Sequence, residues 1–134
     1  MHELTLVDGI LRAVEATARE RGRKVSGVTV MVGELAQFDT GVVRRLFNDL
    51  KRATPLHDTK VTVRREKARV RCMTCGNEFT FRDLSPSLTS ESKEAIHFLP
   101  ELIGSYFSCP RCSKSFFEIE GGRSVSISEI EFDE

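Results

Sequence analysis

All four cysteines of this 134-residue chain fall in two short Cys-x-x-Cys pairs, Cys72 with Cys75 and Cys109 with Cys112. Two such pairs can close a tetrahedral site around one metal ion, because each pair supplies two thiolates to one side of it. Zinc is the metal expected for an all-thiolate site of this kind. Four protein ligands leave no position for water or substrate, so we expect a structural zinc ion rather than a catalytic one.

A second candidate metal site lies at the start of the chain, Met1-His2-Glu3. A free amino terminus, the peptide nitrogen that follows it and the imidazole of residue 2 can form fused chelate rings around Ni(II) or Cu(II), which favour square-planar nitrogen ligands. The bulky His2 should leave Met1 in place, and Glu3 adds another peptide nitrogen and a carboxylate. By itself, such a start is more often a plain solvated terminus than a metal site.

The remaining histidines and one basic run are weaker candidates. His97 lies between two apolar residues, which is typical of a partly buried histidine but leaves a ligand role open. His57 stands in a polar turn and is expected to be a loop residue. A basic run could contact phosphate, although a charged strand edge explains it better; its members are Arg64, Arg65, Lys67, Arg69 and Arg71.

Composition and charge narrow the class of protein. Twenty basic and twenty acidic residues cancel, so no global positive field draws the chain onto nucleic acid or an anionic membrane. No apolar run approaches the roughly 18 residues needed to cross a bilayer, and the start lacks the basic segment of a secretory signal. We therefore expect a cytoplasmic protein, in which paired cysteines are more often metal ligands than disulfides.

The elements that must position these residues follow from apolar periodicity. Steps of three and four predict an amphipathic helix over 3–21, ended by Gly22, and a second helix that starts at Asp39 or Thr40 and ends before Pro55. Alternation predicts strands over 25–32, 60–66 and 125–132, the last with a bulge near Ser128. The first two strands flank a helix and could be parallel neighbours.

Between the last two of these strands the character of the chain changes. Two imperfect copies of a short hairpin carry the cysteine pairs, with Gly76 after the first pair and Ser113 in the same place after the second. The fold class predicted is α+β: a small domain with two helices and a three-stranded mixed sheet, 1–66 plus 121–134. A rubredoxin-like zinc-ribbon domain, 67–120, is inserted into it.

Several motifs, taken in order, resemble the HypA/HybF family of hydrogenase maturation nickel metallochaperones. They are Met1-His2-Glu3, Gly33-Glu34-Leu35 after the first strand, both cysteine pairs, and the Ile-x-x-Ile-Glu close of Ile127 to Glu131. The long segment with Ile96-His97-Phe98 resembles the extended archaeal members. The resemblance implies nickel bound at His2 and Glu3 with backbone nitrogens taking part, His97 able to supply a further ligand, and structural zinc on the cysteines.

The resemblance also implies a function and partners. It predicts a carrier of Ni(II) without enzymatic activity, a HypB-type nickel GTPase and the hydrogenase large subunit precursor as partners, and a monomer or weak dimer. Nucleic acid and membrane are not expected as partners. The alternative from another class is a zinc-ribbon nucleic-acid-binding module that uses the basic run, which zero net charge makes less favourable.

Overall fold

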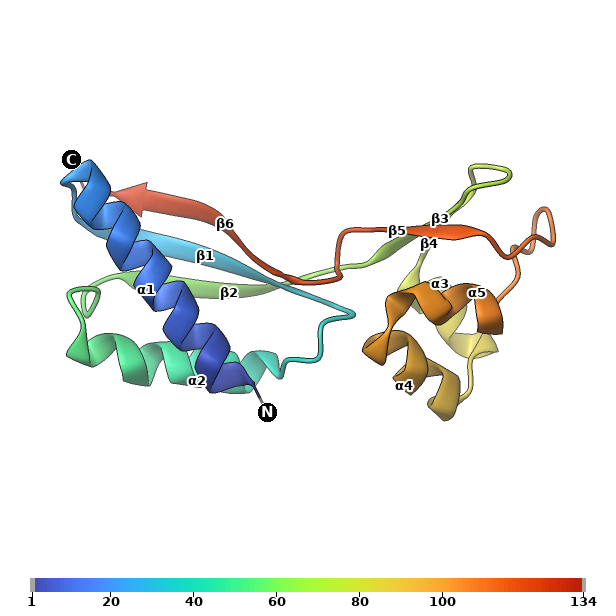
Figure 1. Ribbon diagram of the computed structural model, residues 1–134, viewed down its shortest axis with the longest axis horizontal. Helices are drawn as coiled ribbons and strands as arrows, with labels where there is room; N and C mark the ends of the chain where they lie inside the picture. The colour runs from blue at the N-terminus through green and yellow to red at the C-terminus, as the bar shows by residue number, and fades with distance from the viewer. Residues whose placement is uncertain (1, 134) are drawn as a thin grey trace. The chain divides into compact units, whose positions relative to one another are not determined.

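The computed structural model describes residues 2–133, which form two compact units (Figure 1). The first unit contains Met1–Val32, Phe38–Arg64 and Val125–Glu134, and the second contains Gly33–Gln37 and Arg65–Ser124. This division differs from the expected domains, 1–66 with 121–134 and 67–120, chiefly at Gly33–Gln37, which group with the second unit.

The first unit packs two helices on one face of a three-stranded sheet. Its elements are α1 (Glu3–Arg21), β1 (Val25–Gly33), α2 (Thr40–Leu50), a 3-10 turn η1 (Lys51–Ala53), β2 (Lys60–Glu66) and β6 (Val125–Phe132). Both helices and the sheet were predicted. One core joins the apolar stripes of α1 and α2 to the inward-facing valines of the strands; its buried members include Val7, Leu11, Val14, Val28, Val30, Val43, Phe47 and Val63.

The sheet is mixed, as predicted, with strand order β2-β1-β6. At the start of the β1 and β2 pair, Thr59 Oγ1 donates to the carbonyl of Val25 at 2.8 Å, and at its end Glu34 N donates to the carbonyl of Glu66 at 2.8 Å. Starts and ends therefore coincide, so β1 and β2 are parallel. Strand β6 is antiparallel to β1, and the register shifts beside Thr29, which leaves Ser128 as the predicted bulge.

The second unit is an antiparallel sheet with short helices inserted between its strands. Its elements are β3 (Arg69–Cys72), β4 (Glu78–Thr80), α3 (Phe81–Leu84), η2 (Ser85–Ser87), α4 (Ser90–Phe98), η3 (Pro100–Leu102), α5 (Ile103–Tyr106) and β5 (Phe117–Glu120), with strand order β4-β3-β5. Its buried residues form a second core, which includes Leu35, Val70, Cys72, Leu84, Ile96, Ile103 and Cys109.

The loop after β1 belongs to this second core. Leu35 is only 1% exposed and packs among the apolar residues of the zinc-binding unit. Its N–H donates to the carbonyl of Gly122 at 2.8 Å, and Gly33 N donates to Ser124 at 2.9 Å. Gly122 has φ 70° and lies so close to Ala68 that a Cβ there would stand 2.5 Å from backbone atoms. Glycine is required at position 122 because it adopts a positive φ readily and has no Cβ to collide with Ala68.

Candidate metal centres

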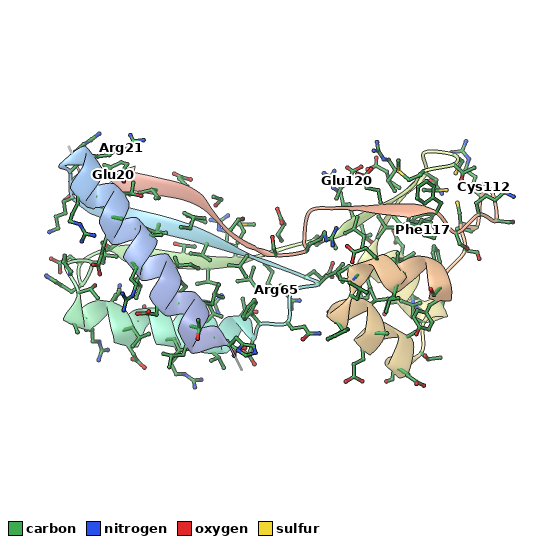
Figure 2. The ribbon with its side chains drawn as sticks, in the orientation of Figure 1. Glu20, Arg21, Arg65, Cys112, Phe117 and Glu120 are labelled. Atoms are coloured by element: carbon green, nitrogen blue, oxygen red, sulfur yellow. The ribbon has the colours of Figure 1, made fainter. Side chains whose placement is uncertain are left out.

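The two cysteine pairs come together as the sequence predicts. All four Sγ atoms lie within 4.8 Å of one another, with 3.5 Å between Cys72 and Cys112 and 3.7 Å between Cys75 and Cys109 (Figure 2). A tetrahedral zinc ion with Zn–S bonds of about 2.3 Å places its sulfurs about 3.8 Å apart. The donor set and its spacing therefore fit zinc, with all four positions filled by protein.

Both knuckles use the same backbone turn. Gly76 N donates to the carbonyl of Cys72 at 2.8 Å, and Ser113 N donates to the carbonyl of Cys109 at 2.7 Å. Gly76 has φ 79° and Ser113 has φ 66°, so both occupy the left-handed region. Ser113 therefore keeps the turn that glycine makes in the first knuckle, at the conformational cost that a side chain carries there.

Backbone hydrogen bonds favour the thiolate form at Cys72 and Cys109, whereas at Cys112 the Lys114 N–H lowers the pKa but burial and the neighbouring cysteine sulfurs outweigh it and raise the pKa to about 12. The pKa of Cys72 is lowered to about 6, mainly because the N–H of Cys75 donates to its sulfur. Burial acts to raise the pKa of Cys109, but backbone N–H groups of the second knuckle, that of Cys112 first, outweigh burial and lower it. A metal ligand must be deprotonated, so these hydrogen bonds prepare the site for a cation.

At the amino terminus, His2 is exposed and immediately precedes α1. Its side chain makes no capping hydrogen bond, while its carbonyl accepts from Leu6 N at 3.0 Å. The first four N–H groups of a helix have no partner in the helical ladder. The peptide nitrogens of His2 and Glu3 can therefore lose their protons to a metal without breaking that ladder. Met1 lies outside the described residues.

Glu3 is placed differently from a simple surface ligand. It is 8% exposed, and its Oε2 accepts from the backbone N–H of Asp39 at 3.1 Å. Asp39 is the N-cap of α2, where its Oδ1 accepts from Val42 N at 3.1 Å. The pKa of Glu3 is lowered to about 2, first by a hydrogen bond with the amino group of the chain and then by the Asp39 N–H. This link between the two helices was not predicted from the sequence.

His97 lies in the last turn of α4, in the second unit. Its ring is half-buried and stands edge-on to Phe81, with 5.5 Å between ring centroids. Among residues 2–133, the cysteine cluster is the one group of three or more His, Cys, Asp or Glu side chains spaced to hold a metal ion. The ligand role of His97 therefore stays a prediction.

Two of the other candidates from the sequence, His57 and Arg71, lie against acidic side chains. His57 Nδ1 lies 3.1 Å from Asp58 in an exposed loop. Within the basic run, Arg71 is held between two glutamates of β5, with 3.0 Å to Glu118 and 3.0 Å to Glu120. Its hydrogen bond with Glu118 is the first cause of its raised pKa. A guanidinium neutralised in this way is poorly placed for phosphate.

The whole chain matches one family model. Residues 1–132 fit the model described as "Hydrogenase/urease nickel incorporation, metallochaperone, hypA". The chain belongs to the HypA family. This description is that of a metallochaperone rather than an enzyme, and the zinc-ribbon nucleic-acid alternative is not favoured. The HypA resemblance inferred from the motifs is confirmed.

Similar proteins agree with the HypA assignment. The chain is 34% identical over 131 residues to a hydrogenase maturation factor HypA of Thermococcus sibiricus, covering 97% of this chain and 95% of that protein. The HypA of Pyrococcus horikoshii is 35% identical over 134 residues, covering 99% and 96%. A solution structure of the Ni metallochaperone HypA from Helicobacter pylori has the same fold, with TM-score 0.60, 19% identity and coverage of 98% and 97%.

The HypA family assignment places the chain among nickel metallochaperones of hydrogenase maturation, and its cysteine cluster fits a zinc site. Among residues 2–133, no helix is both long and apolar enough to span a membrane.

Proposed function

We propose that this protein binds Ni(II) at its amino terminus and delivers it during maturation of a [NiFe]-hydrogenase in the cytoplasm. The observation that supports this most is the setting of His2. Its imidazole is exposed beside peptide nitrogens that the ladder of α1 does not use. A terminus with these donors matches the preference of Ni(II) for nitrogen ligands.

The proposed nickel ligands are the amino group of Met1, the imidazole of His2 and the peptide nitrogens of His2 and Glu3. The Glu3 carboxylate accepts from Asp39 N at 3.1 Å, so it orients the first turn of α1 as well as lying beside the site. The four cysteines Cys72, Cys75, Cys109 and Cys112 hold zinc as a structural ion.

His97 is proposed as a further nickel ligand. Its support is the resemblance to extended HypA members and its place at the end of α4, where the half-buried ring packs on Phe81. The test is a nickel titration of His97→Ala with zinc content measured in parallel. An unchanged nickel affinity and an unchanged rate of nickel release would count against this ligand.

The proposed partners are a HypB-type nickel GTPase and the hydrogenase large subunit precursor, with the protein acting as a monomer or weak dimer. Support comes from the names of the HypA relatives, which are hydrogenase maturation factors. Mixing experiments with purified partners, read by size-exclusion chromatography, test each pairing separately.

The deciding experiment is a nickel titration of zinc-loaded wild type, His2→Ala and a variant with three residues added before Met1, which carry the free amino group too far from His2 to share its chelate rings. Both changes should abolish tight nickel binding and leave zinc content and fold intact, because each removes a donor of the fused chelate. His57→Ala is the matched control and should bind nickel like wild type. Tight binding retained in His2→Ala would overturn the proposed site.

Nickel binding should also depend on pH. Protonated imidazole cannot coordinate a metal, and a peptide nitrogen must lose its proton to bind, so affinity should fall as the pH drops through about 6. Titrations by calorimetry across this range give the dependence directly. A flat affinity between about pH 5 and 8 would contradict imidazole and peptide-nitrogen ligation.

A further inference from the structure

A cavity of about 310 Å³ opens in the first unit where α1 ends. Its apolar side is formed by Ala18 on α1, Val25 at the start of β1, and the loop residues Pro55 and Leu56 that precede β2. The turn at Gly22, with φ 59°, reverses the chain beside it. The cavity thus presents an apolar floor built from three different segments.

The rim of this cavity is basic. Arg19, Arg23 and Lys24 line it together with a single carboxylate, that of Glu15. Figure 2 shows Glu20 and Arg21, which carry opposite charges, at the same end of α1. An apolar floor under three cations is complementary to an apolar group flanked by carboxylates.

Two of these cations are loosely held. Arg19 lies 3.9 Å from Glu15 with 74% of its side chain exposed, and Lys24 lies 3.5 Å from Asp58 with 55% exposed. Exposed ion pairs of this kind contribute little stability. Both cations can therefore re-pair with carboxylates of an incoming segment at small cost.

The position of the cavity separates it from the proposed nickel site. Helix α1 has 19 residues, which at about 1.5 Å each gives a length of about 28 Å. The exposed His2 stands before the first turn, and Arg19 and Gly22 stand at the last (Figure 1). A partner bound at the cavity would leave the amino terminus open.

We propose that this basic-rimmed cavity docks an acidic segment of a protein partner, which inserts one aliphatic or aromatic side chain between its carboxylates. The apolar floor supplies burial for that side chain, and Arg19 and Lys24 pair with the flanking charges. Docking at this end of α1 holds the carrier while its nickel terminus stays free to exchange the ion. Recognition of the segment does not depend on nickel binding.

The probe is an acetylated, amidated peptide with one leucine flanked on each side by two glutamates. It is titrated into the zinc-loaded, full-length protein, and binding is followed by two-dimensional NMR. Amide shifts should concentrate at Ala18, Gly22, Val25 and Leu56. Replacing the leucine by serine, or the glutamates by lysines, should weaken binding at least about fivefold, because each change removes one half of the complementarity.

The main variant is Arg19→Glu with Lys24→Glu, which should weaken peptide binding at least about tenfold. The matched control, Arg12→Glu with Arg45→Glu, changes net charge equally away from the cavity and should change binding less than about twofold. Arg19→Ala with Lys24→Ala serves as the milder second variant, in which the loss should be smaller but in the same direction.

Several results would overturn the proposal. These are peptide shifts that map elsewhere, equal weakening in the main and control variants, or a lysine-flanked peptide that binds as well. Binding of phosphatidylserine vesicles through Arg19 and Lys24 without peptide binding would replace it by a membrane contact. The two sites are tested apart: His2→Ala should keep peptide binding, and the cavity variants should keep nickel affinity.

Discussion

Glu3 serves two needs at once at the start of α1. Its peptide nitrogen is a proposed nickel donor. Its carboxylate accepts a hydrogen bond from the backbone N–H of Asp39, the N-cap residue of α2. The charged form of the carboxylate is favoured, and the pKa falls to about 2, first through the amino group of the chain. The side chain therefore ties the metal-binding turn to the rest of the first unit.

This lowered pKa has a definite pH dependence. A carboxylate with a depressed pKa contributes its stabilisation fully above its ordinary value of 4.5 and loses it as the pH falls toward about 2. In nickel-free protein we expect the chemical shift of the Glu3 side-chain carboxyl carbon to stay nearly constant from pH 6 to about pH 3. A midpoint near 4.5 for this carboxyl carbon would contradict the contact, and Glu3→Gln, whose side chain cannot ionise, should shift the Asp39 amide at neutral pH.

A second prediction concerns the two knuckle turns. Ser113→Gly should stabilise the zinc-binding unit by about 0.5–1 kcal/mol, because glycine adopts φ 66° without the cost that a Cβ carries. Gly76→Ala is the mirror control and should destabilise by about 1 kcal/mol, since nothing lies within 4 Å of the added Cβ and only backbone conformation changes. Thermal unfolding of the zinc-loaded proteins measures both effects. Equal unfolding midpoints in wild type and the two variants would contradict the conformational cost assigned to a side chain at these turns.

At the scale of elements, the regular periodic segments were predicted and the irregular ones were not. Helix α1, helix α2 and the strands of the first unit have long apolar stripes, which set both type and boundaries. Helix α4 was missed because only Ser92 and Ile96 are buried on it, too few for a periodic signal. The sequence contains one signal for the start of α4, the N-cap residue Thr89, whose side chain accepts a hydrogen bond from Ser92 N.

The cysteine site was predictable because zinc chemistry imposes its own spacing on the sequence. The packing of Leu35 was not, since nothing in a short Gly-Glu-Leu sequence says which of two cores its leucine enters. The contact depends on the close passage of Gly33 and Gly122, which a local pattern does not reveal. The Glu3 contact with Asp39 was missed for the same reason, because 36 residues separate the partners.

The loop after β1 gives a prediction at this scale. Leu35→Ala should destabilise the zinc-binding unit by about 2–4 kcal/mol, because a side chain that is 1% exposed leaves a cavity in the second core. The rate of zinc transfer to a competing chelator measures the effect, and this rate should be higher in Leu35→Ala than in wild type. Leu4→Ala, at a leucine that is 57% exposed, is the control and should change the rate little. Equal rates in wild type and Leu35→Ala would show that the loop does not support the zinc site.

At the scale of the whole molecule, the two units have separate cores. The first is held by two helices on a sheet, whereas the second joins short strands and short helices and includes Cys72 and Cys109 of the zinc site among its buried residues. Zinc binding free energy contributes to the folding free energy of a unit whose core includes the metal ligands. The zinc ion is therefore expected to matter far more to one unit than to the other.

Removal of zinc by a chelator should unfold the second unit and spare the first. The NMR amide signals of β3, β4 and β5 should collapse toward random-coil positions, and those of α1 and β6 should remain dispersed. Re-addition of zinc should restore the spectrum, which separates this effect from damage. Loss of both sets of signals together would show that the two units unfold as one.

The passage of Leu35 into the second core also bears on how this protein can be recombined. The zinc-binding unit is encoded by two separate stretches, Gly33–Gln37 and Arg65–Ser124. A chimera of two relatives that exchanges only the longer stretch would pair the leucine of one parent with the core of the other. Exchange of both stretches together keeps the core from a single lineage, so the functional module of this chain is discontinuous in its gene.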